Sequence, residues 1–94
     1  MREYEVVVIF QSDLDENTIN GLVERITGWI NDSGGSVTQT DHWGKRRLAY
    51  TIRKQTEGYY ILIHARMLPT FTAELERNLR FTEPVLRYLV TVVR

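Results

Sequence analysis

The chain has 94 residues, 43% of them hydrophobic, and its 12 Lys and Arg residues balance its 12 Asp and Glu residues. A chain of this length can bury one two-layer core, so we expect a single domain over residues 1–94. It has no cysteine, which excludes a disulfide framework and a thiolate metal site. The apolar run near the N-terminus is too short for a signal peptide or a membrane span, so we expect a soluble, cytoplasmic protein.

Alternating side chains near the N-terminus predict a β-strand over residues 2–10. One face of this strand is formed by Tyr4, Val6, Val8 and Phe10, and the other by Glu3, Glu5, Val7 and Ile9. Because the second face is half apolar, we expect the strand to be central in a sheet or to meet another molecule.

A helical repeat of apolar residues predicts an α-helix over residues 15–31. The apolar side of this helix is formed by Ile19, Leu22, Val23, Ile26, Trp29 and Ile30. Asp13 or Asp15 can accept hydrogen bonds from the free backbone N–H groups of the first turn. The pair Gly34–Gly35 should end the helix, because glycine adopts the left-handed conformation at little steric cost.

The middle of the chain predicts two long strands. Residues 36–53 run extended with a bulge or bend at Gly44, residues 54–58 make a short turn, and residues 59–67 form the next strand. In that strand Tyr59, Ile61, Ile63 and Ala65 should face the core, with Tyr60, Leu62, His64 and Arg66 opposite.

Pro69 should open a second helix, since proline is tolerated in the first helical turn. Phe71, Leu75 and Leu79 recur every four residues and predict the buried side of this helix. Pro84 blocks its continuation, and residues 85–93 should form the last strand.

The resulting element order, βαββαβ, predicts an α+β fold of the ferredoxin-like type. Right-handed crossovers place both helices on one face of a four-stranded antiparallel sheet with strand order 4-1-3-2. The other face stays open, and Val7, Ile9 and Leu62 should leave apolar surface there. A patch of that kind is often a contact site.

The sequence lacks the patterns that indicate catalysis. His42 and His64 do not have metal-ligand spacing, and no GxSxG elbow, GxGxxG loop or Walker-type loop occurs. We therefore predict no enzyme, no metal, no cofactor and no small-molecule substrate. An enzyme using either histidine would need a carboxylate within hydrogen-bond reach of the ring, in a pocket.

The segment 44–54, GKRRLAYTIRK, holds five basic residues and no acidic one, although the whole chain is neutral. One interpretation is a solvated strand, with the basic side chains in water and Leu48, Tyr50 and Ile52 on the core. The other is RNA binding. Arginine outnumbers lysine ten to two in the chain, and its planar guanidinium binds phosphate bidentately and stacks on bases.

Other residues favour the RNA interpretation. Trp43 and Tyr50 place aromatic rings in or beside the basic segment, a combination that suits phosphate contact with base stacking. Arg2, Arg80 and Arg87 can converge at the same end of the sheet. An RNA-recognition domain is a weaker alternative, because Gly58 and Tyr59 match its RNP1 motif but Glu57 replaces the basic residue.

The segment from Gly44 to Arg53 resembles the signature of the bacterial small-subunit ribosomal protein six family. The opening MREYEVVVIF resembles the first strand of that family, Gly58-Tyr59-Tyr60 the start of its third strand, and LRFTEPVLRYLV its last helix and strand. The resemblance covers essentially the whole chain and agrees with the predicted fold.

The resemblance implies a structural protein of the small ribosomal subunit. It implies binding to the central domain of 16S-type ribosomal RNA, as a heterodimer with small-subunit ribosomal protein eighteen, and no membrane. By the same resemblance, the candidate RNA-binding residues are Arg2, Lys45, Arg46, Arg47, Tyr50, Arg80 and Arg87. Val7, Ile9 and Leu62 become candidates for the protein partner. The alternative is a ferredoxin-like regulatory or small-molecule-binding domain that dimerises through its sheet, for which the arginines should be scattered.

Overall fold

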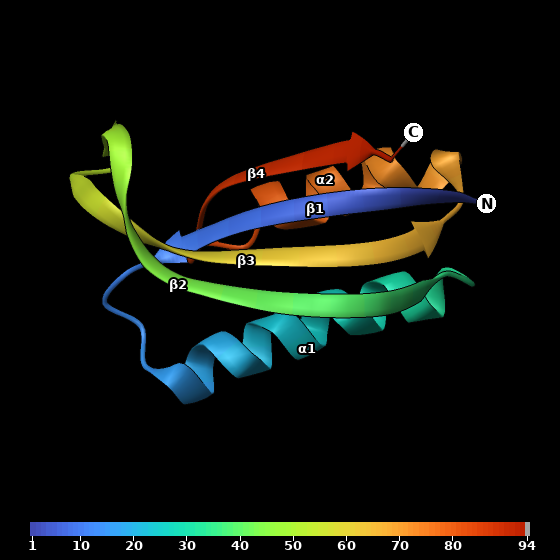
Figure 1. The fold of residues 1–94 in the computed structure, drawn as a ribbon, viewed down its shortest axis with the longest axis horizontal. Helices are drawn as coiled ribbons and strands as arrows, with labels where there is room; N and C mark the ends of the chain where they lie inside the picture. Colours follow the sequence, from blue (N-terminus) through green and yellow to red (C-terminus); the bar gives the residue numbers. More distant parts are fainter. Residues whose placement is uncertain (94) are drawn as a thin grey trace.

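The computed structural model describes residues 1–93, which form four strands and two α-helices (Figure 1). In chain order the elements are β1 (Arg2–Gln11), α1 (Glu16–Asp32), β2 (Ser36–Ile52), β3 (Gln55–Met67), the 3₁₀ turn η1 (Pro69–Phe71), α2 (Thr72–Arg80) and β4 (Val85–Val92). The predicted βαββαβ order is confirmed. None of the helices in residues 1–93 is long and apolar enough to cross a membrane.

The strands form one antiparallel sheet in the order β2-β3-β1-β4, which is the predicted 4-1-3-2 order. Both helices lie on the same side of this sheet (Figure 1). The central pair runs in unbroken register from Arg2 opposite Met67 to Gln11 opposite Gly58. This register fixes which side chains stand at each end of the sheet.

The core lies between the sheet and the helices, where the alternating strand faces meet the apolar sides of α1 and α2. The predicted inward residues of β1, β3 and the helices are buried, except Tyr59 and Trp29, which are partly buried against the core. Val6, Val8, Phe10, Ile61 and Ile63 have no exposed surface. The alternation of apolar side chains along the strands therefore determines which face of the sheet the helices cover.

The ends of α1 follow from local chemistry. The Asp15 carboxylate accepts a hydrogen bond from the Thr18 backbone N–H at 2.7 Å, so Asp15, one of the two candidates, is the N-cap. Hydrogen bonds from the Thr18 side chain and backbone lower the pKa of Asp15 from its ordinary value of 3.8. Gly34, at φ +92°, takes the left-handed conformation just beyond the helix.

The connection between β2 and β3 differs from the sequence prediction. Residues 54–58 were expected to form the turn, but Ile52 pairs with Gln55 and only Arg53 and Lys54 lie between the strands. Both have positive φ, 47° and 65°, as a two-residue primed hairpin turn requires. The usual signal for this turn is Asn or Gly, which the sequence lacks here, and β3 therefore begins four residues earlier than predicted.

Candidate nucleic-acid interface

The long strand β2 does not lie flat along β3. Its pairing with β3 shifts register between Val37 and Gln39, between His42 and Gly44, and between Arg47 and Ile52. Gly44 has φ +82°, so the predicted bulge at this glycine is confirmed. Each shift adds twist and bend to the strand, and the far end of the hairpin rises above the sheet (Figure 1).

The raised hairpin folds back over the face of the sheet opposite the helices. A shallow hollow beneath it is lined by residues of the hairpin, of β1 and of β4: Ile9, Leu48, Ala49, Tyr50, Ile52, Tyr60 and Arg87. At its floor, a Cβ added to Gly58 would overlap Cγ2 of Ile9 and lie 3.3 Å from Cδ2 of Leu48. The missing side chain of Gly58 therefore lets the hairpin approach β1 closely.

The prediction for the open face was wrong for two of its three residues. Ile9 and Leu62 were expected to be exposed there, but they are only 9% and 8% exposed. Ile9 lies in the hollow with Leu48 and Ile52 of the hairpin. Val7 is half-buried. Leu89, opposite Val7 in the β1–β4 register, is 61% exposed and adds apolar surface to this face.

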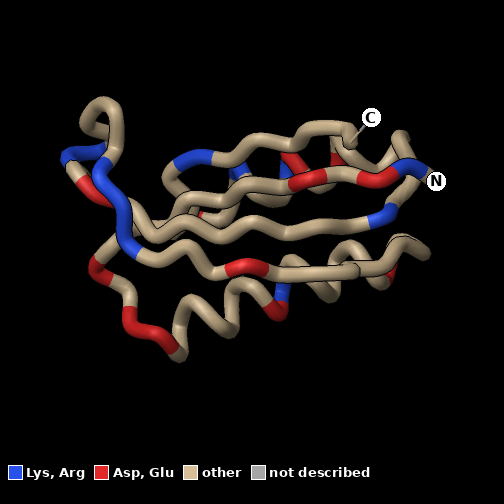
Figure 2. Tube along the Cα trace, viewed as in Figure 1, with Lys and Arg blue, Asp and Glu red and all other residues tan. Residues whose placement is uncertain are grey.

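The basic residues of the hairpin gather at one end of the molecule (Figure 2). Lys45, Arg46, Arg47, Arg53 and Lys54 are all exposed. Arg87, near the start of β4, joins them, because its guanidinium carbon lies 5.4 Å from the Tyr50 ring centroid. We call these six residues the basic rim.

Two further predicted arginines lie differently. Arg80 ends α2, three residues before Glu83, whose carbonyl accepts a hydrogen bond from Arg53, so it stands on the helical side of the same end. Arg2 was expected to converge there too, but it pairs with Met67 at the opposite end of the sheet. Ile9, the partner of Arg87, lies seven positions after Arg2 along β1, which is about 23 Å at the usual strand rise.

Aromatic rings accompany the rim. The Trp43 and Tyr60 rings stack with centroids 6.2 Å apart and planes 17° from parallel, and the Arg46 guanidinium carbon lies 5.3 Å from the Trp43 centroid. Tyr50 is 55% exposed, so it does not face the core as the solvated-strand interpretation required. Tyr60 was not among the predicted site residues, although the alternation along β3 places its side chain on this face.

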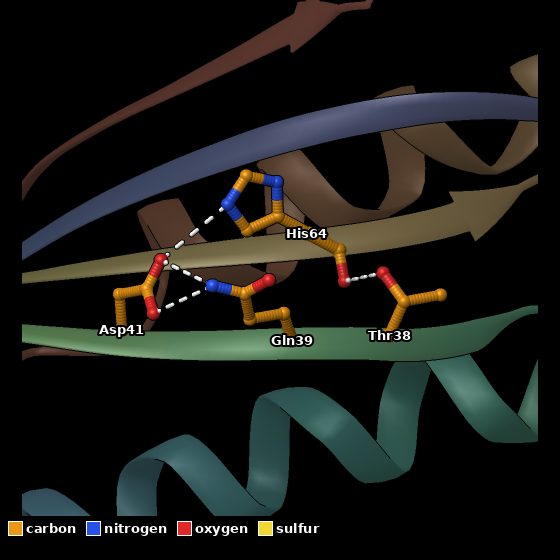
Figure 3. A network of polar contacts seen from close by, with 4 residues as sticks. All are labelled: Thr38, Gln39, Asp41 and His64. Carbon is orange, nitrogen blue, oxygen red and sulfur yellow. Dashed lines mark hydrogen bonds and ion pairs between the residues drawn. The ribbon is translucent and has the colours of Figure 1, made fainter.

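A polar network lies on the same face, farther along β2 and β3 (Figure 3). The Asp41 carboxylate lies 3.5 Å from Nε2 of His64 and accepts hydrogen bonds from the Gln39 amide at 2.9 and 3.0 Å. A carboxylate therefore does approach one histidine. The hydroxyl in this network, on Thr38, donates to the His64 carbonyl at 3.2 Å rather than to the ring. The arrangement is that of side chains paired across neighbouring strands.

Among residues 1–93, no group of three or more His, Cys, Asp or Glu side chains could hold a metal ion. The fold and the basic rim define a ferredoxin-like α+β protein whose prominent surface is suited to binding a polyanion.

Comparison with known proteins identifies the family. Residues 3–92 match the family model described as ribosomal protein S6. The chain therefore belongs to the ribosomal protein S6 family, which consists of structural proteins of the small ribosomal subunit rather than enzymes.

The similarity extends over nearly the whole length of the relatives. The chain is 46% identical over 91 residues to small ribosomal subunit protein bS6 of Moorella thermoacetica, covering 97% of this chain and 93% of the relative. It is 47% identical over 90 residues to the bS6 protein of Caldanaerobacter subterraneus subsp. tengcongensis, covering 96% and 95%. The crystal structure of 30S ribosomal protein S6 from Thermotoga maritima superposes with a TM-score of 0.91 at 30% identity, covering 98% and 87%.

Proposed function

We propose that this protein binds the central domain of small-subunit ribosomal RNA through its basic rim, together with small-subunit ribosomal protein eighteen. The observation that carries the proposal is the convergence of six exposed basic residues from β2, the hairpin turn and β4 at one end of a neutral protein. Such clustering favours RNA binding over the alternative, a regulatory domain with scattered arginines.

The rim supplies the two kinds of contact that folded RNA needs. Lys45, Arg46 and Arg47 provide cations for phosphate oxygens, and arginine also adds bidentate geometry. The exposed ring of Tyr50, held beside Arg87, offers a surface on which an unpaired base can stack. Arg80 extends the positive surface towards the helices, whereas Arg2 lies too far away to act in the same contact.

The number of charges bounds the strength of this contact. Neutralising about four phosphates gives a slope of log K against log salt near −3, at about 0.7–0.9 per phosphate. That electrostatic contribution is modest at physiological salt. We therefore propose that the chain alone binds RNA weakly and that the partner protein adds the remaining affinity.

For the partner we propose the apolar strip between β1 and β4, where Val7 lies opposite the exposed Leu89. Leu62 lies opposite Val7 on β3 and Ile9 lies two residues along β1, so both border this strip, although little of either side chain is exposed. An apolar patch bordered by charged residues is the usual anatomy of a protein contact.

The test is a gel-shift titration of a central-domain ribosomal RNA fragment with this chain, with protein eighteen, and with both together. We expect the pair to bind at least 100-fold more tightly than this chain alone. Tight binding of generic RNA by this chain alone at physiological salt would contradict the proposal, and so would the absence of any effect of the partner.

A further inference from the structure

We propose that Arg53 is a positioning residue that latches the β2–β3 hairpin onto the start of β4, and so holds the basic rim in its binding arrangement before RNA arrives. This inference deepens the proposed function and rests on it for its RNA-binding part. Arg53 is thereby separated from its neighbours in the basic segment, which we assign to direct contact with phosphate.

The guanidinium of Arg53 is committed to two backbone carbonyls. Nη1 donates to the Glu83 carbonyl at 2.9 Å, and Nη2 donates to the Val85 carbonyl. A planar guanidinium that grips two carbonyls on one segment fixes orientation as well as distance. The tip of the hairpin is thereby tied to residues about 30 positions later in the chain.

The acceptor segment is itself firmly held. The Pro84 carbonyl accepts a hydrogen bond from the Gln11 backbone N–H at 3.0 Å, and the Val85 N–H donates to the Thr82 carbonyl at 2.9 Å. Thr82 is buried, and its hydroxyl donates to the Asn78 carbonyl of α2 at 2.7 Å. Arg53 therefore anchors the hairpin to a fixed part of the domain.

The hairpin needs such an anchor because its own pairing is interrupted. Residues 48–51 fall in the register shift between Arg47 and Ile52, where β2 has no matched partner on β3. The turn itself places two non-glycine residues, Arg53 and Lys54, at positive φ, a conformation that persists only where surrounding contacts impose it. The contacts of Arg53 with Glu83 and Val85 supply that constraint.

Lys54 provides a matched comparison within the same turn. It shares the left-handed conformation and the positive charge of Arg53. Within residues 1–93, however, its ammonium makes no hydrogen bond or ion pair of its own. Loss of either side chain removes one charge from the tip, but only the loss of Arg53 removes the latch.

The first test is amide hydrogen exchange of the free protein, comparing Arg53→Ala, Arg53→Lys and Lys54→Ala. With Arg53→Ala we expect amides of residues 45–52 to exchange about tenfold faster, while the core strands β1 and β3 keep their protection. Lysine at position 53 can reach one carbonyl at a time, so Arg53→Lys should give an intermediate rate. Lys54→Ala should stay within about twofold of the wild type. Unchanged exchange in Arg53→Ala would overturn the latch.

The second test is the salt dependence of binding to the central-domain RNA fragment in the presence of protein eighteen. Arg53→Ala should lower affinity about three- to tenfold with an unchanged salt slope, because no phosphate contact is lost. A slope smaller by about 0.7–0.9, with unchanged hydrogen exchange, would make Arg53 a phosphate ligand and overturn the proposal. If the wild-type chain bound no RNA, the proposed function would be wrong. The proposed role of Arg53 in RNA binding would then be wrong as well. The exchange rates would still decide whether Arg53 holds the hairpin.

Discussion

The guanidinium carbon of Arg87 lies 5.4 Å from the ring centroid of Tyr50, although these residues belong to the two edge strands of the sheet. Two strands, β3 and β1, separate β2 from β4. The contact exists because the bulged end of β2 folds back across the open face. Positive charge from opposite edges of the sheet is thereby gathered on one surface.

The Arg87–Tyr50 contact should contribute measurably to the stability of the folded hairpin. A double-mutant cycle with Arg87→Ala and Tyr50→Ala, followed by urea unfolding, is expected to give a coupling energy of about 0.5–1 kcal/mol, typical of a cation–π pair at an exposed site. Tyr50→Phe retains the ring and should preserve the coupling. A coupling energy indistinguishable from zero would show that the contact does not hold the hairpin.

Replacing the arginines of the rim should weaken RNA binding without weakening the fold. Arg46→Ala and Arg47→Ala should each reduce the salt slope by about 0.7–0.9, measured by filter binding with the partner present. Each change should alter the free energy of unfolding by no more than about 0.5 kcal/mol, as is usual for surface substitutions.

Arg2→Ala is the control for those two variants. It removes the same charge from the opposite end of β1 and should leave the salt slope within error of the wild type. If Arg2→Ala weakened binding as much as Arg46→Ala, the RNA surface would extend over both ends of the sheet.

A core substitution should lower stability and leave the salt dependence of RNA binding unchanged. Ile26, on the inward side of α1, is 1% exposed, and Ile26→Ala should lower the free energy of unfolding by about 2–5 kcal/mol through lost burial and a cavity. Below the unfolding transition, the folded variant should bind RNA with the same salt slope as the wild type. A change in that slope would mean that packing in the core affects the arrangement of the basic rim.

The N-cap of α1 should make stability depend on pH in the acid range. The hydrogen bonds from Thr18 depress the pKa of Asp15 in the folded state below 3.8. Its contribution to stability is therefore present above pH 3.8 and is lost as pH falls through the depressed folded value. Asp15→Ala should lower the Tm at neutral pH, and its difference from wild type should shrink below pH 3.8.

Asp13→Ala is the matched control, since it removes a carboxylate two residues earlier that does not cap the helix. Its effect on the Tm at neutral pH should be smaller than that of Asp15→Ala. A Tm difference for Asp15→Ala that stayed constant from neutral pH to pH 2 would contradict the capping role.

The helix-covered half of the fold could be predicted because burial there follows a regular period. Val6, Val8, Ile61 and Ile63 alternate on strands with unbroken register, and Leu75 and Leu79 repeat at helical spacing. The strand order then followed from the handedness of the crossovers. These features depend on local sequence and topology alone.

The open face could not be predicted in the same way, because it depends on where the hairpin folds. Alternation placed Ile9 and Leu62 on that face correctly, but it carried no information that β2 would bend back over β1. The turn at Arg53 and Lys54 has no glycine or asparagine to mark it, and the carbonyl partners of Arg53 lie far away in sequence. Arg2 was misplaced although the predicted antiparallel order already set the start of β1 against the end of β3, the end of the sheet away from the hairpin turn.

The most direct test of the account is the sedimentation of a tagged form of this chain in a bacterial lysate on a sucrose gradient. The variant carrying Lys45→Ala, Arg46→Ala and Arg47→Ala is compared with the wild type after both are shown to unfold at the same temperature. We expect the wild-type chain to travel with the small ribosomal subunit and the triple variant to remain with free protein at the top. Equal sedimentation of the two chains with the small subunit would contradict the claim that the basic rim binds ribosomal RNA.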